Sequence, residues 1–159
     1  MAEPTQGAFT PTIFYRDPMA ALSWLEAAFG FETCLLVTDD EGGVGHAEMT
    51  FMGASLAVGG EWSSSDLLGA ASLKSPASLD GVGTQFVRVH LTDGLEAHCA
   101  RARAAGARIT QEPAYQFYGA RTYRALDLEG HVWNFDQPVK TPSIDEMAAV
   151  SGLKFAQSL

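Results

Sequence analysis

Residues 17–30 read DPMAALSWLEAAFG, and residues 93–106 read DGLEAHCARARAAG. In both stretches an aspartate opens a run with apolar side chains at helical spacing, and a glycine closes it. Asp17 is a natural N-cap followed by proline, and Gly30 is suited to the left-handed conformation that ends a helix. The offset that places Asp17 on Asp93 also places Gly30 on Gly106. Two capped helices of the same length and register indicate an internal duplication.

Strand-like segments surround each expected helix in the same order. One segment precedes the helix, one follows it, and a hairpin that turns at a glycine comes last. We expect strands at 10–16, 32–38, 46–52 and 55–58, and again at 86–91, 108–111, 122–128 and 131–135. The sequence therefore predicts an α+β fold with two βαβββ modules. They span residues 8–59 and 83–137, with a Ser/Gly-rich connector at 60–82 that can hold a short helical turn.

The residues after the second module predict one more helix. Ser143 and Glu146 form a capping-box pattern before a short apolar run, so we expect a tail helix at 142–150. This helix is expected to pack on the sheet or on a partner subunit. All 159 residues are then one domain.

The composition is that of an ordinary globular protein, with 47% apolar and 18% charged residues. A net charge of −9 repels phosphates, so no nucleic-acid partner is expected. The apolar runs are far shorter than the ~20 residues of a membrane helix, and the N-terminus resembles no secretory signal. We therefore expect a cytoplasmic protein with no membrane partner. Cys34 and Cys99 have no CxxC spacing and are expected to be reduced thiols.

Local motifs resemble those of one superfamily. Residues 45–49 read GHAEM, and residues 117–135 read FYGARTYRALDLEGHVWNF, which contains the pattern YGxR…DxxGHxW. Together with the repeat, these motifs resemble those of the vicinal-oxygen-chelate superfamily, which contains glyoxalase I, bleomycin-resistance proteins and extradiol dioxygenases. The resemblance is strongest to its glyoxalase-like branch. The resemblance covers residues 8–137. It implies one cupped, incompletely closed mixed sheet with helices outside, a ligand on its concave face, and a homodimer.

The resemblance also implies where a metal would bind. Metal-dependent members supply ligands from the first and fourth strands of each module, which correspond here to Thr10, Ala57, Phe86 and Asn134. Nickel, zinc, iron and manganese need histidine or carboxylate ligands, and none of these four residues offers one. We therefore expect no cofactor at the usual metal site of the family.

Alternation along the expected strands predicts a polar surface inside the cup. Because Val87, Val89 and Leu91 are suited to packing on the helices, Arg88 and His90 should face the cup. Applied to the other strands, this alternation gives a predicted cluster of His46, Glu48, Arg88, His90, Arg121, Tyr123 and Asn134, with Thr12, Phe14 and Tyr118 as further ligand contacts. Basic groups and a carboxylate around an apolar hollow are typical of a small-ligand pocket. The loop at 117–119 is expected to form its rim or lid.

Structural roles can explain several of these residues equally well. Arg88 and Glu48 can form an ion pair, and Tyr123 can be a core aromatic whose hydroxyl is satisfied. Asp127 and His131 are expected to fix the turn at Glu129-Gly130.

Three functions remain open from the sequence. The first is a metal-independent protein that binds a small organic ligand between its modules. The second is a metal-dependent lyase, isomerase or dioxygenase that uses His46, Glu48 and His90 as ligands of a divalent metal. The third is acid–base catalysis with Glu48 or His46 as base and Arg121 as oxyanion stabiliser. The sequence specifies neither the ligand nor a reaction.

Overall fold

Two βαβββ modules follow one another in a computed structural model that describes residues 7–63 and 71–159. The first module contains β1 (Thr12–Tyr15), α1 (Pro18–Phe29), β2 (Glu32–Thr38), β3 (Val44–Phe51) and β4 (Ala54–Gly60). The second contains β5 (Phe86–His90), α2 (Leu95–Ala104), β6 (Arg108–Tyr115), β7 (Ala120–Leu126) and β8 (Val132–Pro138). The predicted order of elements is confirmed, although β6 and β8 run further than expected.

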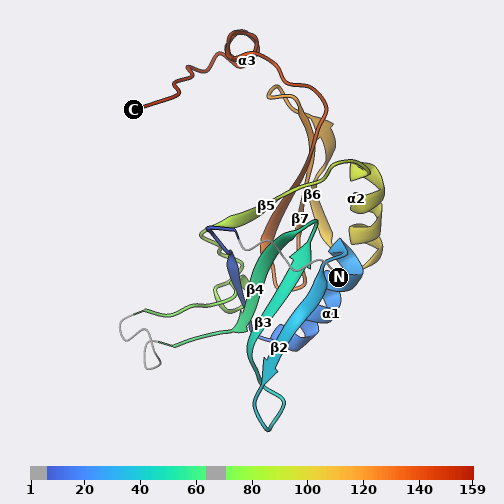
Figure 1. Ribbon diagram of the computed structural model, residues 1–159, viewed down its shortest axis with the longest axis vertical. Coiled ribbons are helices and arrows are strands. Elements are labelled where there is room, and N and C mark those ends of the chain that lie inside the picture. Colours follow the sequence, from blue (N-terminus) through green and yellow to red (C-terminus); the bar gives the residue numbers. More distant parts are fainter. Residues whose placement is uncertain (1–6, 64–70) are drawn as a thin grey trace.

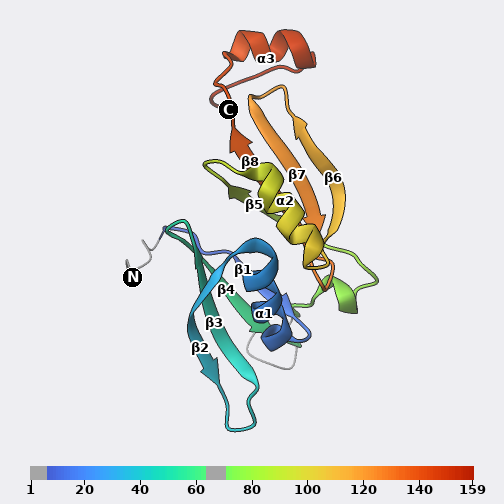
Figure 2. The same ribbon diagram turned by 90° about the vertical axis from the view of Figure 1, so that its right-hand side faces the viewer.

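Each module forms its own four-stranded mixed sheet with the same topology. The strand orders are β1-β4-β3-β2 and β5-β8-β7-β6, with β1 parallel to β4 and β5 parallel to β8. Both helices lie on the same side of these sheets and pack against each other where the two modules meet (Figures 1 and 2). Among the described residues no strand of one sheet pairs with a strand of the other, so the sheets do not close into a barrel.

The two helices end as their sequences suggest but begin differently. The side chain of Asp17 accepts a hydrogen bond from the backbone N–H of Ala20 at 3.0 Å, and Gly30 ends α1 in the left-handed conformation. In the second module Gly94 is the N-cap and α2 has no side-chain cap, so Asp93 does not repeat the role of Asp17. The helices have 12 and 10 residues rather than equal lengths.

The hydrophobic core lies between the helices and the sheet faces that they cover. Aromatic residues dominate it: Phe29 at the end of α1 packs within 5.3 Å of both Trp133 and Phe135 of β8, measured between ring centroids. In β1, β3 and β5 alternate side chains point into this core, so the others project from the opposite side. We call that opposite side the open face of each sheet.

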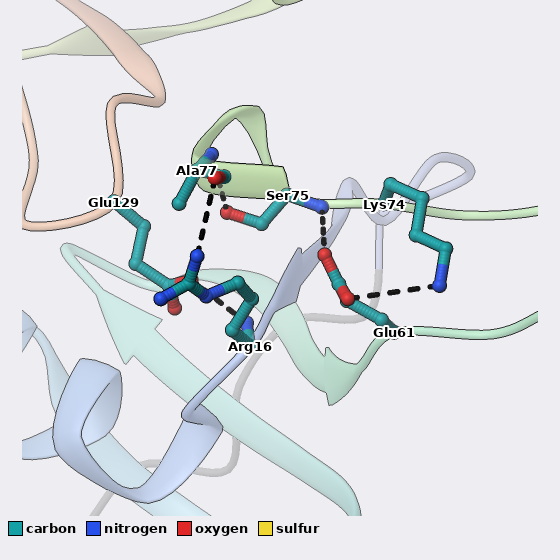
Figure 3. A network of polar contacts seen from close by, with 6 residues as sticks. All are labelled: Arg16, Glu61, Lys74, Ser75, Ala77 and Glu129. Carbon is teal, nitrogen blue, oxygen red and sulfur yellow. Dashed lines mark hydrogen bonds and ion pairs between the residues drawn. The ribbon is translucent and has the colours of Figure 1, made fainter. Parts of the chain in front are cut away.

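Polar contacts join the two modules at the start of α1. Glu129, in the turn between β7 and β8, accepts hydrogen bonds from the backbone N–H groups of Arg16 and Asp17 at 2.8 and 3.2 Å. The guanidinium of Arg16 in turn donates to the carbonyl of Ala77, in the 3-10 helix η1 (Pro76–Ser78) of the connector (Figure 3). The expected short helical turn in the connector is therefore confirmed at η1.

A second part of this network holds the connector itself. Glu61 accepts a hydrogen bond from the backbone N–H of Ser75 at 2.8 Å and forms an ion pair with Lys74 at 3.7 Å (Figure 3). Trp62 and Leu73 form an isolated antiparallel bridge beside it. The part of the predicted connector at 64–70 lies outside the described residues.

The tail helix α3 (Ile144–Ser151) has the predicted capping box between Ser143 and Glu146. It lies beyond the ends of β7 and β8, away from the first module (Figure 2), and none of its residues is buried. In the described parts of the chain no helix is long and apolar enough to cross a membrane. Cys34 is exposed, Cys99 is buried, and both are free thiols.

Candidate functional site

The edge strand β5 presents two basic side chains on its open face. Val87 and Val89 are partly buried against the core, whereas Phe86, Arg88 and His90 are exposed. This alternation confirms the orientation that the sequence predicts for β5. The neighbouring strand β8 is parallel to β5 and places Asp136 opposite His90.

Asp136 is a buried carboxylate that binds both basic residues. Its relative exposure is 1%, and Oδ2 accepts a hydrogen bond from Nε of Arg88 while Oδ1 is bonded to Nδ1 of His90. A carboxylate can be buried at moderate cost only when charged or hydrogen-bonding partners replace its water. Arg88 and His90 supply these partners, so the three side chains form one unit, which we call the Asp136 cluster.

The Asp136 cluster leaves polar atoms of both basic residues available. A carboxylate oxygen only accepts, so Nδ1 of His90 carries the proton of this hydrogen bond and neutral His90 has its lone pair on Nε2. Among described residues, the terminal nitrogens of Arg88 have no hydrogen-bond partner, and the guanidinium lies 5.6 Å from the ring centroid of Tyr118. The side chains of Arg88 and His90 are 49% and 68% exposed, which leaves these atoms accessible.

A cavity of about 460 Å³ lies beside the cluster, between the modules. One wall is β5, including Arg88 and His90. The other wall comes from the first module and is mainly apolar, formed by Phe9, Thr10, Pro11, Phe31 and the hairpin residues Phe51, Met52 and Leu56. Arg88 and His90 are the ionisable members of the described lining, so charge is concentrated on one wall.

Four other predicted site residues lie on the open face of the first sheet. Nε2 of His46 and Oε1 of Glu48 are 3.3 Å apart, and neither residue lines the cavity beside the cluster. Thr12 and Phe14 instead line a second cavity of about 440 Å³ together with connector residues. The expected ion pair between Arg88 and Glu48 is wrong, because Arg88 binds Asp136 and Glu48 contacts His46.

The predicted orientation of Arg121 and Tyr123 into the cup is also wrong. Tyr123 is fully buried in the core, and its hydroxyl lies 2.6 Å from Nδ1 of His98 on α2. Arg121 pairs with Glu96 in the first turn of α2 at 2.6 Å. Burial also raises the pKa of Tyr123. The alternative interpretation of Tyr123 as a core aromatic with a satisfied hydroxyl is therefore correct, and the open-face phase of β7 belongs to Thr122 and Arg124.

Asn134 lies on the open face as predicted, but it is 6% exposed and pairs in register with Arg88. The sequence prediction missed Asp136, which follows Asn134 by two positions. It ended this strand at residue 135, whereas β8 continues to Pro138 by pairing with Ala120–Thr122. Extending the alternation by one step, with the parallel pairing of β5 and β8 taken from the repeat, would have placed Asp136 beside His90.

The positions that correspond to the usual metal ligands of the fold do not suit a metal. Ala57 pairs with Thr12, Phe86 pairs with Val132, and neither pair contains a histidine or carboxylate. Within residues 7–63 and 71–159 no three histidine, cysteine or acidic side chains gather as a metal site would require. Among these residues His46, Glu48 and His90 are therefore not brought together as the three-ligand site that the sequence leaves open.

Comparisons with known proteins identify relatives in sequence and solved structures with a similar fold. An uncharacterised protein of Mycobacterium bovis is 28% identical over 150 residues, covering 94% of this chain and 95% of that protein. The crystal structure of TioX from Micromonospora is 28% identical, with a TM-score of 0.61 over 84% of this chain and 100% of TioX. A variant of the fosfomycin resistance protein FosX from Listeria monocytogenes, crystallised with Mn(II) and 1S,2S-dihydroxypropylphosphonic acid, shares the fold at 12% identity. Its TM-score is 0.59 over 89% of this chain and 94% of FosX.

The family model described as Glyoxalase/Bleomycin resistance protein/Dioxygenase superfamily matches residues 8–135. This range includes the first module, the second module up to the middle of β8, and all but one residue of the Asp136 cluster. Because the family model matches most of the chain, and because its two βαβββ modules form sheets of the same topology, the chain belongs to the glyoxalase/bleomycin resistance protein/dioxygenase superfamily.

Proposed function

We propose that this chain binds a small organic anion in the cavity beside the Asp136 cluster. The observation that carries the proposal is the combination of an apolar wall from one module with Arg88 and His90 on the other. The cavity has a volume of about 460 Å³, which falls in the range of about 300–1,000 Å³ that small-molecule sites occupy. Such sites commonly combine apolar walls with a few polar groups that fix orientation.

The chemistry of Arg88 points to a carboxylate or phosphonate on the ligand. A guanidinium offers a planar set of donors that matches these groups, and the terminal nitrogens of Arg88 are available for them. The net charge of −9 opposes an anion only weakly, because charges more than about 8 Å away are largely screened at physiological salt. The phenylalanine-rich wall favours an aromatic or aliphatic body attached to that anionic group.

Calorimetric titration with a panel of acids tests the proposal. The panel contains phenylpyruvate, benzoate, phenylphosphonate and propylphosphonate, with benzyltrimethylammonium as a cation of similar size. Phosphonates are included because FosX, which shares the fold, was crystallised with one. We expect at least one anion to bind and the cation not to bind. Binding of the cation alone, or of no member of the panel, would contradict the proposal.

Substitutions at Arg88 separate its role from a general effect of charge. Losing a hydrogen bond to a charged group costs about 1.5–3 kcal/mol, so Arg88→Gln should raise Kd about ten- to a hundredfold. Arg88→Lys keeps the charge without the planar donors, and its Kd should lie between the values of the wild type and Arg88→Gln. Arg103→Gln is the matched control, since Arg103 pairs with Glu112 on the outer side of the second module and does not line the cavity. Circular dichroism establishes that each variant is folded.

A further inference from the structure

The Asp136 cluster has the arrangement of a proton-transfer site as well as a binding site. We propose that His90 accepts a proton from the bound ligand through Nε2, with Asp136 as the positioning residue that holds the imidazole in the required tautomer. This inference rests on the proposed function, because the cavity beside the cluster must hold the ligand. It assigns to that site a class of reaction, the reversible removal of a proton next to a carbonyl group.

The fixed tautomer is the first support for this proposal. A neutral histidine in water exchanges between two tautomers, and a base must present its lone pair to the substrate. The hydrogen bond from Nδ1 to the buried carboxylate of Asp136 selects the tautomer with the lone pair on Nε2. Nε2 has no protein hydrogen-bond partner among the residues that the structure describes. The nitrogen that could accept a proton is therefore the accessible one.

The charges of the cluster are the second support. The reacting form has a neutral His90, so that before transfer the charge of Asp136 is balanced by Arg88 alone. When the ligand loses a proton from a C–H bond, the electron pair of that bond stays on the ligand as an enolate and His90 becomes an imidazolium. Asp136 stabilises the new positive charge, and the terminal nitrogens of Arg88 can stabilise the negative oxygen. Return of the proton regenerates His90, so the step needs no oxidant, reductant or further reactant.

The proton-transfer step restricts the ligand class more than the binding proposal alone does. The ligand should carry an anionic group for Arg88 and a C–H bond acidified by a carbonyl for His90. Phenylpyruvate meets both requirements and adds an aromatic ring that suits the apolar wall. It is therefore the probe for this inference, and its exchange of protons with solvent reports the proposed step.

The tautomer can be measured without any ligand. In protein labelled with ¹⁵N, long-range proton–nitrogen spectra at pH 8 distinguish the two tautomers of each neutral histidine. We expect His90 to have a protonated Nδ1, and Asp136→Asn to move it towards a mixture of the two forms. A predominantly Nε2-protonated His90 in the wild-type protein would overturn the inference while leaving the binding proposal intact.

Proton exchange in D₂O tests the catalytic role. The benzylic protons of phenylpyruvate should be replaced by deuterium faster with protein than in a buffer blank. With saturating probe, His90→Gln should reduce the protein-dependent rate about a hundredfold or more, as expected for loss of a general base, and calorimetry on the same variant measures any weakening of probe binding separately. Asp136→Asn should reduce the rate without abolishing binding. The exposed position of His90 makes its variant the safer of the two for folding.

Other outcomes of the exchange experiment would exclude His90 as the base or identify another residue in that role. Exchange at the blank rate with bound probe overturns the role of His90 as a base, whatever its tautomer. Exchange that survives His90→Gln but is lost in Glu48→Gln identifies Glu48 as the base, the role predicted for it from the sequence. Absence of calorimetric binding by every acid of the panel contradicts the binding proposal itself and removes the ligand on which this inference depends.

Discussion

The hydroxyl of Tyr15 on β1 donates a hydrogen bond of 2.6 Å to Oδ2 of Asp127, in the turn after β7. The two residues belong to different modules, and both are buried. The same oxygen of Asp127 accepts from Nε1 of Trp133 at 3.0 Å, while Oδ1 accepts from the backbone N–H groups of Glu129 and His131. Asp127 fixes the turn as the sequence predicts, and in addition it joins the turn to the first module.

Tyr15→Phe should therefore weaken the contact between the modules. Burial, followed by the charge of Asp127, raises the pKa of Tyr15, so its hydroxyl remains a donor at neutral pH. Removing that donor leaves a buried carboxylate with one fewer partner, and we expect a loss of about 1–3 kcal/mol in the free energy of unfolding. Urea denaturation followed by tryptophan fluorescence measures it. Tyr115→Phe, at an exposed site, is the control and should stay within about 0.5 kcal/mol of the wild type.

His98 should make stability depend on pH. Its Nε2 donates to the carbonyl of Phe29 at 2.9 Å, so Nδ1 of the neutral ring accepts from the hydroxyl of Tyr123. Burial lowers the pKa of His98, and the hydrogen bond to Phe29 opposes this only in part. The unfolded chain, with a histidine pKa of about 6.5, then binds this proton at a higher pH than the folded chain. Stability should fall as the pH drops below about 6.5 and should stop falling below the folded pKa.

Urea titrations between pH 7.5 and pH 5 measure this loss in the wild-type protein and in His98→Gln. The slope of unfolding free energy against pH should be smaller in the variant, because the titrating group is gone. His46→Gln is a suitable comparison, since His46 is about half exposed. If His98→Gln and the wild type had the same slope in this interval, the assignment to His98 would be wrong.

The pattern was interpreted correctly in strands such as β3 and β5, in which apolar residues alternate with polar ones. In β3, Ala47 and Met49 face the core while His46 and Glu48 do not, and β5 follows the same rule with its valines. In β7 the alternating residues are Thr122 and Tyr123, both of which carry a hydroxyl and are buried. Only the three-dimensional neighbours, His98 for Tyr123 and Gln111 for Thr122, decide which residue faces which side.

The extent of a strand is also difficult to obtain from local sequence. β6 continues through Pro113 to Tyr115 because it pairs with β7, and β8 continues past Phe135 because it pairs with the start of the same strand. Pairing between strands depends on residues far apart in the chain, so local propensity underestimates it. For this reason the repeat and the glycines that end both helices could be predicted locally, whereas placing Asp136 beside His90 requires the pairing of β5 with an extended β8.

Gly119 should not tolerate a side chain. Its φ is +92°, and its carbonyl accepts hydrogen bonds from the N–H groups of Val139 and Lys140 at 2.9 and 3.0 Å. A β-carbon there would clash with the carbonyl oxygen of Lys140 and lie 2.5 Å from Cδ of Pro142. These contacts tie the loop at 117–119 to the chain after β8, which argues against the free lid expected from its glycine.

Gly119→Ala should therefore lose more than about 1 kcal/mol in the free energy of unfolding. The matched control is Gly53→Ala, because Gly53 has a φ of +82° but a β-carbon added there would meet no atom within 4 Å. Both substitutions carry the strain of a left-handed backbone, and only the first adds a clash. If Gly119→Ala and Gly53→Ala lost the same free energy of unfolding in thermal or urea denaturation, the chain after β8 would have to move away freely from Gly119.

A second copy of this chain should cover α3. This helix has only eight residues, a length at which isolated helices are unstable in water, and its capping box and terminal Gly152 do not replace tertiary packing. Val150 is 75% exposed, and Leu153 and Phe155 after the helix are exposed as well. The linker at 139–142 is fixed at Gly119 and directs the helix away from its own modules (Figure 2).

We therefore expect the intact chain to sediment at twice its 16.9 kDa mass, as a homodimer. Ending the chain at residue 142 or introducing Val150→Asp should shift it towards the monomer, whereas Leu128→Asp, on an exposed turn, should not. A monomeric intact chain at concentrations of about 100 μM would contradict this assignment, because obligate interfaces persist far below that concentration.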